Sequence, residues 1–309
     1  MTKPFYSIVL PVYNEEEVLP ALYERLVLTL ERLEGGGEIV FVNDGSTDCS
    51  LTILKGFHAS DPCVRIVSLS RNFGHQIAIT AGLAYASGKA VAVLDADLQD
   101  PPELLPKFFK LLGEGWDVVY GVRKERKEGA AKRLAYFLFY RLLRSIATID
   151  VPVDSGDFCV MSRRVVDHLN RLPESGRFLR GLRAWLGFRQ LGVAYERDAR
   201  FAGNPKYTFA KLIKLSLDGL VSFSHAPFRL VLVAGLVIAL GSLVAGAVAV
   251  YRSLFAAYVP GYIWIGILLL FVGGIQLLSF GVIGEYVAII FHQTKSRPLF
   301  VVDELIGLE

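Results

Sequence analysis

The chain has 309 residues, of which 53% are hydrophobic and 20% are charged, and its net charge at pH 7 is +3. This composition excludes a disordered chain, a collagen-like fibre and a small disulfide scaffold. The net charge is too small to indicate nucleic-acid binding by itself. The apolar excess is concentrated near the C-terminus, which separates the chain from ordinary soluble domains.

Short β-branched runs alternate with helical patterns in the N-terminal part of the chain. The predicted strands are Ser7–Val12, Glu38–Asn43, Arg65–Ser70, Lys89–Leu94 and Asp117–Gly121, and the helical segments between them include Ser50–Ala59 and Gly74–Ser87. Asn14 is the expected N-cap of the first helix, because three glutamates follow it where the helix dipole favours anions. The alternation predicts an α/β domain with a mostly parallel sheet, whose ligands bind beyond the carboxyl ends of the strands.

Two later segments, residues 131–147 and 207–223, are amphipathic and carry apolar side chains on one face with basic residues beside them. They fit either surface helices packed on the sheet or interfacial helices lying on anionic lipid. We favour the interfacial interpretation because the second segment leads directly towards an apolar run, although the periodicity fits both.

Two runs, Leu230–Tyr251 and Tyr262–Gly284, contain no charged residue. At about 1.5 Å rise per residue, each would cross a hydrocarbon core about 30 Å thick. Basic residues precede the first run and follow the second, so the positive-inside rule predicts a multi-pass protein of the inner (plasma) membrane with both termini cytoplasmic. We expect a cytosolic domain over residues 1–228, a two-helix transmembrane anchor over 229–294 and a cytosolic tail over 295–309.

Asp95 and Asp97 follow a buried apolar strand in the run Val91-Ala-Val-Leu-Asp-Ala-Asp-Leu-Gln-Asp-Pro-Pro-Glu. Two carboxylates this close repel one another unless a cation, a proton or a donor lies between them. Mg²⁺ fits this pair, because it takes one or two carboxylates together with phosphate oxygens, and Gln99 could add an amide oxygen. The alternative is an acidic loop in which Asp100 caps the following helix.

Three motifs resemble those of family 2 glycosyltransferases. They are Ser7-Ile-Val-Leu-Pro-Val-Tyr-Asn-Glu-Glu, Val42-Asn-Asp-Gly-Ser-Thr-Asp and Asp95-Ala-Asp-Leu-Gln-Asp-Pro-Pro-Glu. The extension of the third motif, together with Arg200-Phe-Ala-Gly-Asn-Pro-Lys-Tyr-Thr and Arg297-Pro-Leu-Phe-Val-Val, is similar to the polyprenyl-phosphate glycosyltransferases. That group contains dolichol-phosphate mannose synthase and the bacterial two-span polyisoprenyl-phosphate glucosyltransferases, and the similarity covers essentially the whole chain.

The resemblance implies a GT-A fold that binds a nucleotide-diphosphate sugar. The residues that it places around the nucleotide sugar are Pro11, Tyr13, Glu15, Asp44, Asp95 and Asp97. Of these, Asp44 would contact the base, and Asp95 and Asp97, helped by Gln99, would hold Mg²⁺ or Mn²⁺ against the diphosphate. A cation there would stabilise the charge of the departing diphosphate. Glu15 fits equally well as an acidic residue at a helix N-terminus.

The cationic residues expected at the acceptor phosphate are Arg123, Arg133, Arg200 and Lys206. Each also fits a solvated surface charge, but the resemblance places Arg123, Arg200 and Lys206 at the active site. This chain departs from the family pattern at Asn204-Pro205-Lys206, where related proteins usually have Ser or Thr before the lysine. Proline offers a phosphate neither a hydroxyl nor a backbone N–H.

Asp157, in Asp154-Ser-Gly-Asp-Phe-Cys-Val-Met, is the candidate catalytic base, and Asp97 and Arg123 complete the expected catalytic set. A phosphate monoester has its second pKa near about 6, so a phosphate acceptor is mostly dianionic at pH 7 and already nucleophilic. A base would be nearly redundant, and we expect Asp157 mainly to position the sugar or a cationic clamp residue. His75 is expected to begin the next helix near the nucleotide.

The expected activity is inverting transfer of a single sugar, with UDP-glucose as the favoured donor, to polyisoprenyl (undecaprenyl) phosphate at the cytoplasmic membrane face. One alternative is a processive polysaccharide synthase, although two spans do not easily enclose a polymer channel. The other is a non-catalytic membrane scaffold, against which the intact Asp95 and Asp97 pair argues. Glycines in the apolar runs would permit a homo-oligomer, and a separate flippase is expected downstream.

Overall fold

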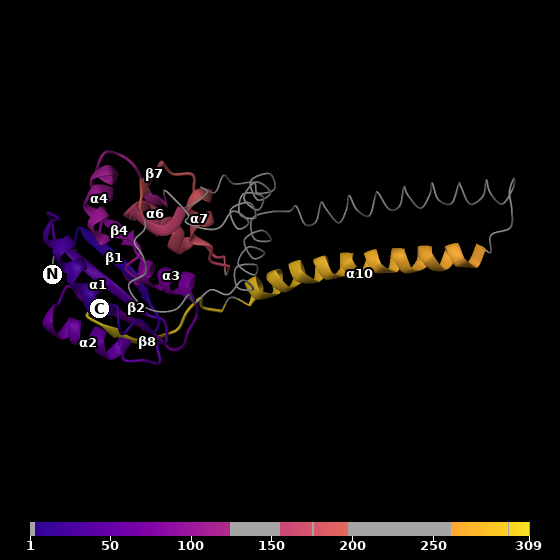
Figure 1. The fold of residues 1–309 in the computed structure, drawn as a ribbon, viewed down its shortest axis with the longest axis horizontal. Helices are drawn as coiled ribbons and strands as arrows, with labels where there is room; N and C mark the ends of the chain where they lie inside the picture. Colours follow the sequence, from indigo (N-terminus) through magenta and orange to yellow (C-terminus); the bar gives the residue numbers. More distant parts are fainter. Residues whose placement is uncertain (1–3, 124–154, 175, 197–260, 296, 309) are drawn as a thin grey trace. The chain divides into compact units, whose positions relative to one another are not determined.

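The computed structural model describes residues 4–123, 155–174, 176–196, 261–295 and 297–308 of the chain (Figure 1). These residues belong to two compact units, a sheet domain and the helix α10 (Gly261–Thr294). The amphipathic segments 131–147 and 207–223 and the first uncharged run lie outside the described residues.

An eight-stranded sheet with the order β7-β5-β6-β4-β1-β2-β3-β8 forms the centre of the sheet domain. Its strands are β1 (Tyr6–Val12), β2 (Gly37–Asn43), β3 (Val64–Leu69), β4 (Ala90–Val93), β5 (Val118–Arg123), β6 (Ser155–Ser162), β7 (Gln190–Tyr195) and β8 (Val302–Ile306). The first five confirm the predicted strands, with their ends shifted by a residue or two.

The sheet is mixed, with four parallel and three antiparallel pairings among the described strands, so the prediction of a mostly parallel sheet holds by a small majority. Strand β1 pairs in parallel with β2 and β4, as do β2 with β3 and β5 with β7, whereas β3–β8, β4–β6 and β5–β6 are antiparallel. The sequence analysis did not identify β6, β7 or β8. Strand formation at these positions depends on distant partners more than on local pattern.

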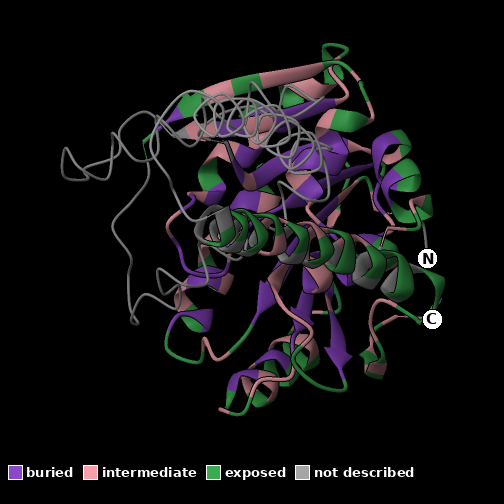
Figure 2. Ribbon diagram, turned by 90° about the vertical axis from the view of Figure 1, so that its right-hand side faces the viewer, coloured by how far each residue is buried: buried purple, intermediate pink, exposed green. Residues whose placement is uncertain are grey.

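Helices cover both faces of the sheet. The core on one face includes α1 (Leu19–Glu31), α2 (Ser50–Ser60) and α4 (Leu105–Gly113), and the 3₁₀ turn η1 (Pro102–Leu104) precedes α4. The other face carries α3 (His75–Tyr85), α6 (Arg163–Arg171) and α7 (Leu179–Trp185). Successive side chains of β1 point to opposite faces of the sheet: Ile8 packs in the core on the side of α1, α2 and α4, and Val9 faces α3. Figure 2 shows the buried strands in purple.

Helix α3 lies directly on β1 and β2 because Gly82 has no side chain. A Cβ atom at Gly82 would overlap Val9 Cγ1 and would lie 2.9 Å from Val42 Cγ2. This close approach fixes the position of α3, whose first residues reach the carboxyl ends of the strands.

The prediction that Asn14 caps the first helix was wrong. Helix α1 begins at Leu19, and Asn14 lies before it in the left-handed region with φ 53°. The Asn14 side-chain oxygen instead accepts a hydrogen bond from Thr47 N at 2.8 Å. A proline in the first turn of α1 presets the helical φ, so that start needs no side-chain cap.

The C-terminal tail forms the edge strand of the sheet. Strand β8 pairs with β3, Val301 O accepts a hydrogen bond from Ser70 N at 3.0 Å, and Lys55 forms a 2.6 Å ion pair with Glu304. The tail therefore covers the backbone edge of β3 that would otherwise be open to pairing with another chain.

Helix α10 contains the second uncharged run of the sequence, Tyr262–Gly284. Among the residues that the structure describes, no helix has the combination of length and hydropathy required of a membrane span.

Candidate active site

The candidate site lies where the course of the sheet reverses. The chain runs from β1 outward to β2 and β3 and then returns to the other side of β1 to form β4. In open α/β sheets, ligands bind at this reversal, outside the carboxyl ends of the strands. Tyr13 follows β1, Asp44 follows β2, and Asp95 and Asp97 follow β4, so the structure brings these predicted site residues to one edge.

The loop after β4 is held by long-range and local contacts. The hydroxyl of Tyr195, on β7, donates a hydrogen bond to Asp100, which is fully buried. Within the loop, Asp97 Oδ1 accepts a hydrogen bond from Gln99 N at 3.2 Å, and buried Leu98 adopts φ 57°. A left-handed leucine costs about 1–2 kcal/mol, so its burial and the Asp100 anchor maintain the loop conformation.

The alternative role for Asp100 as a helix cap was wrong. The residue before η1 is Pro101, no side-chain cap is present there, and Asp100 pairs with Tyr195 instead. The bond between Asp100 and Tyr195 therefore anchors the loop that carries Asp95 and Asp97, instead of starting a helix.

Asp44 anchors the loop that leads into α3. Its two carboxylate oxygens accept hydrogen bonds from Phe73 N at 2.7 Å and Gly74 N at 3.0 Å. Burial raises the pKa of Asp44, against the effect of these two backbone hydrogen bonds. Gly45 follows with φ 66°, and a Cβ there would lie 2.5 Å from the backbone carbon of Arg71. The base contact expected for Asp44 stays a prediction.

Asp157 meets Asp95 because of the antiparallel register between β4 and β6. Val93 pairs with Cys159. In an antiparallel pair, Asp95, two residues after Val93, therefore lies near Asp157, two residues before Cys159. The Asp157 side chain is 10% exposed, and its Oδ1 lies 3.2 Å from Arg180 Nε. Its Oδ2 accepts a 2.8 Å hydrogen bond from Gln76 Nε2.

His75 joins the two carboxylates. It is the first residue of α3, as predicted, and its Nε2 lies 3.3 Å from Asp95 Oδ1 and 3.4 Å from Asp157 Oδ2. Burial disfavours the charged imidazole, but the bond to Asp157 and the charge of Asp95 outweigh burial and raise the pKa of His75 to about 9. The imidazole is therefore cationic at neutral pH.

The two carboxylates have opposite pKa shifts. Burial raises the pKa of Asp95 to about 6, against the charge of His75 and with neighbouring carboxylates adding to the rise. Burial would also raise the pKa of Asp157, but the charge of Arg180 and the bonds from His75 and Gln76 hold it well below its usual range. Asp157 is thus ionised, fully engaged and a weak proton acceptor, which favours the positioning role expected from the sequence.

Sequence reasoning missed Gln76 and Arg180 as members of this cluster. Gln76 Oε1 also accepts a 3.0 Å hydrogen bond from Leu179 N, which ties the start of α3 to the start of α7. No local signal in the sequence identifies these two residues, because their roles depend on contacts between separate helices.

The remaining predicted residues are placed as follows. Pro11 is buried in β1, Tyr13 is 38% exposed, and Glu15 N donates a 3.0 Å hydrogen bond to Ser50 Oγ. Arg123 is the last residue of β5. Arg133, Arg200 and Lys206 lie outside the described residues, so the acceptor-binding set remains a prediction.

The residues of the acidic loop fit a hard divalent cation in their donor chemistry. Asp95 and Asp97 offer carboxylate oxygens at the same strand end, and burial, with a smaller contribution from neighbouring carboxylates, raises the pKa of Asp95, so a bound cation would stabilise its ionised form. Within the described part of the chain, no group of three or more His, Cys, Asp or Glu residues is arranged to hold a metal ion. Further ligands would have to come from the substrate or from other groups.

Comparison with known proteins establishes the family. Residues 7–169 match the family described as glycosyl transferase family 2. The chain belongs to this family. Along 98% of its length it is 46% identical to the glycosyltransferase YkcC of Bacillus subtilis, of which 95% is covered. It is therefore a glycosyltransferase, and its mixed α/β sheet is of the GT-A type that the resemblance implied.

Two further relatives carry more specific names. The SfII prophage-derived bactoprenol glucosyl transferase of Shigella flexneri is 40% identical to this family 2 chain, with 96% of each chain covered. The prophage bactoprenol glucosyl transferase homolog of Escherichia coli is 38% identical, with 96% of this chain and 97% of that protein covered. These similarities agree with the predicted polyprenyl-phosphate group.

Proposed function

We propose that this glycosyltransferase moves one glucosyl residue from UDP-glucose to the phosphate of a polyprenyl lipid, undecaprenyl phosphate. The observation that carries the proposal is the 40% identity to a bactoprenol glucosyl transferase over 96% of both chains. The grouping of Asp95, Asp97 and Asp157 at one edge of the sheet supports it. A diphosphate donor and a phosphate acceptor are both anionic, so their site needs charged residues that can hold a cation and position cationic side chains.

The proposed step is a single in-line displacement. An oxygen of the lipid phosphate attacks the anomeric carbon, the bond from that carbon to the diphosphate oxygen breaks, and UDP leaves with the bonding electrons. One displacement inverts the anomeric centre. The attacking phosphate is mostly dianionic at pH 7, since its second pKa is about 6, so Asp157 has no proton to remove.

The residues of the chain then have separate tasks. Asp95 and Asp97, with Gln99, would hold Mg²⁺ or Mn²⁺, which when bound would stabilise the negative charge of the departing diphosphate. His75 holds Asp95 and Asp157 at a fixed separation by contacting both. Arg123, Arg133, Arg200 and Lys206 are the proposed cationic contacts of the acceptor.

We also propose that the protein acts at the cytoplasmic face of the inner membrane, with both termini cytoplasmic. This part rests on the sequence: two uncharged runs lie between basic flanks, and segments 131–147 and 207–223 are amphipathic. A lipid acceptor with its phosphate at the interface would then meet the enzyme on the same surface, which raises its effective concentration.

Sugar transfer by the purified full chain in detergent tests the proposal. The reaction would contain undecaprenyl phosphate, one radiolabelled UDP- or GDP-sugar at a time, and either Mn²⁺ or EDTA. We expect one labelled lipid product, formed from UDP-glucose and carrying one sugar, that is lost with EDTA and in Asp97→Ala. Asp303→Ala, an exposed aspartate of β8, is the matched control and should retain activity.

Other products would redirect the proposal. A ladder of labelled polymers would favour a processive synthase, and a single product from another donor would change the sugar but not the reaction. Binding of UDP-glucose without transfer to any lipid phosphate would contradict the proposed acceptor.

A further inference from the structure

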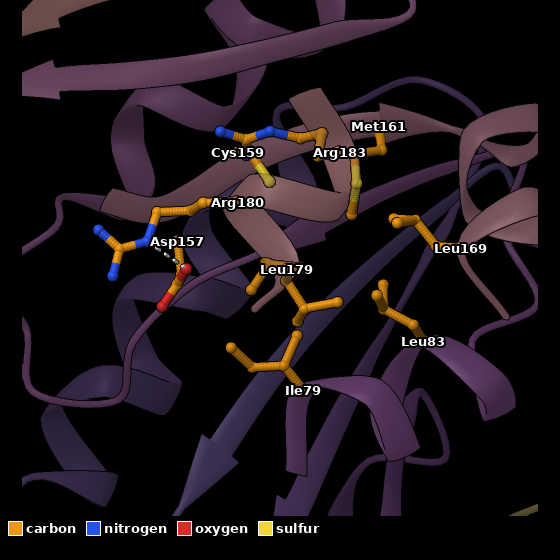
Figure 3. Close-up of a pocket in the computed structure, with 10 residues that line it drawn as sticks. Ile79, Leu83, Asp157, Cys159, Met161, Leu169, Leu179, Arg180 and Arg183 are labelled. Atoms are coloured by element: carbon orange, nitrogen blue, oxygen red, sulfur yellow. Dashed lines mark ion pairs between the residues drawn. The ribbon is translucent and has the colours of Figure 1, made fainter. Parts of the chain in front are cut away.

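Asp157 determines the direction of the Arg180 side chain. The ion pair uses Nε of the guanidinium, 3.2 Å from Asp157 Oδ1, and Figure 3 shows the terminal nitrogens of Arg180 pointing away from the carboxylate. The Arg180 side chain is 25% exposed. A guanidinium held through Nε presents its two terminal nitrogens side by side, which is the geometry that binds two oxygens of one phosphate.

A second arginine on α7 adds positive charge behind Arg180. Arg183 lies one helical turn later, is 3% exposed, and lines the same small cavity as Asp157 and Arg180. Its Nε and one terminal nitrogen have no hydrogen-bond partner among the described residues, and its guanidinium lies 5.0 Å from the ring centre of Tyr120. Within the described part of the chain no carboxylate forms an ion pair with Arg183, and a buried cation in that state is stabilised when an anion approaches, so this end of α7 favours an anionic ligand.

The order of the contacts indicates which anion this is. Asp95 contacts His75, His75 contacts Asp157, and Asp157 contacts Arg180. Arg180 is therefore separated by two side chains from the carboxylates proposed to hold the donor diphosphate and its cation. In an inverting displacement the nucleophile attacks opposite the leaving group, so a cation on the far side of Asp157 suits the attacking phosphate.

We propose that Arg180 binds the phosphate of the polyprenyl acceptor and that Asp157 and Gln76 position it for this contact. The inference rests on the proposed function, and it adds to the predicted acceptor residues one that lies within the described domain. Gln76 contributes because it bonds both Asp157 and the first backbone N–H of α7, which fixes the carboxylate relative to the helix that carries Arg180.

Direct binding tests the inference without requiring turnover. The full chain in detergent would be titrated with farnesyl phosphate, a short soluble prenyl phosphate, and separately with UDP-glucose, using wild type, Arg180→Gln and Arg180→Lys. Loss of a charge-assisted bidentate contact predicts about 10- to 100-fold weaker binding of farnesyl phosphate by Arg180→Gln. Arg180→Lys should recover part of that loss, and UDP-glucose binding should change by less than about twofold in both variants.

The control is Arg164→Gln, which removes an arginine that is 62% exposed and pairs with Asp117 away from the cluster. It should leave both affinities unchanged. Equal binding of farnesyl phosphate by wild type and Arg180→Gln, or no binding by the wild type, overturns the inference. Weaker binding of UDP-glucose with farnesyl phosphate unaffected also overturns it, because it assigns Arg180 to the donor.

Turnover distinguishes failure of this inference from failure of the proposed function. If the wild type transfers glucose to undecaprenyl phosphate but Arg180→Gln keeps its KM for the lipid, the function stands and the inference fails. If Arg180→Gln binds farnesyl phosphate weakly while the wild type transfers no sugar, the phosphate contact stands and the proposed reaction fails.

Discussion

Replacing Asp157 with Asn separates a positioning carboxylate from a catalytic base. Asn has nearly the same shape as Asp but carries no charge and has one N–H₂ group. Asp157 accepts from Gln76 on one oxygen and faces Arg180 with the other. If the amide oxygen of the substituted side chain keeps the bond to Gln76, its N–H₂ group faces Arg180, donor against donor. The guanidinium then loses the contact that directs it.

The size of the effect follows from the burial of the pair. Removing one partner of a buried ion pair costs about 3–5 kcal/mol. Because the Arg180 side chain is 25% exposed, water replaces part of the lost interaction, and we expect about 2–3 kcal/mol. At about 1.4 kcal/mol per tenfold change, this is roughly a 30- to 160-fold loss in kcat/KM.

The pH dependence supplies the second half of the test. The pKa of Asp157 is held well below its usual range, so the stabilisation from its ionised form is fully present above the unfolded value of about 3.9. It is lost only when the pH falls through the lower folded value. Between pH 6 and 8 Asp157 therefore stays ionised, and its own titration adds no pH dependence to the ratio of wild-type to Asp157→Asn rates. The loss should appear mainly as a higher KM for the lipid phosphate.

The assay is the initial rate of glucosyl transfer against each substrate at pH 6, 7 and 8. Asp117→Asn is the matched control, because it makes the same substitution in an aspartate–arginine pair outside the cluster, whose arginine is 62% exposed, and it should keep wild-type rates. A loss of about 10²–10⁴-fold in kcat with both KM values unchanged, reversed as the pH rises, would establish Asp157 as a general base and refute our reasoning.

Three further predictions concern the supports of the site. The pKa of His75 is raised to about 9, so the stability that protonated His75 gives the fold is fully present below the unfolded value of about 6.5 and is lost as the pH rises through about 9. In EDTA, the thermal midpoint of His75→Gln should therefore fall less between pH 7 and 9.5 than that of the wild type. Equal slopes for the two proteins would contradict the ion pairs. Tyr195→Phe removes the hydroxyl bonded to fully buried Asp100. We expect the free energy of unfolding, measured with denaturant, to fall by about 1–3 kcal/mol, and metal-dependent binding of UDP-glucose to weaken. Unchanged binding would show that the loop after β4 keeps its shape without this anchor. Gly82→Ala adds a methyl group against β1 and β2 and should destabilise the fold by about 1–3 kcal/mol, whereas Gly56→Ala, in open space within α2, should be neutral or stabilising by up to about 1 kcal/mol.

The sequence alone predicted the parallel half of the sheet and the acidic residues at its edge. Strands β1 to β4 are short apolar runs separated by helical patterns, and such runs mark buried parallel strands without reference to distant residues. The position of Asp44, Asp95 and Asp97 follows from these strands, because residues directly after parallel strands lie at the same edge of the sheet. The family was also evident from motifs in this region.

Local pattern failed where a residue has a distant partner. Asn14 has the position and chemistry of a helix cap, but the loop after β2 supplies the N–H group of Thr47, which its side chain bonds instead. The C-terminal tail resembles a separate segment in the sequence, yet Val302–Ile306 completes the sheet beside β3. In both cases a tertiary hydrogen bond replaces the local structure that the pattern favours.

The cluster around Asp157 depended entirely on the tertiary structure. The sequence, read with the family resemblance, indicated Asp157 as the candidate base. Only the pairing of β4 with β6 brings it to Asp95, and only the packing of α7 beside α3 brings Arg180 and Gln76 to its two oxygens. The sequence determined which side chains follow each strand, because that is set by the order of residues along the chain. Which side chains meet across strands and helices depends on register and packing between remote segments, and these set the charge of the site.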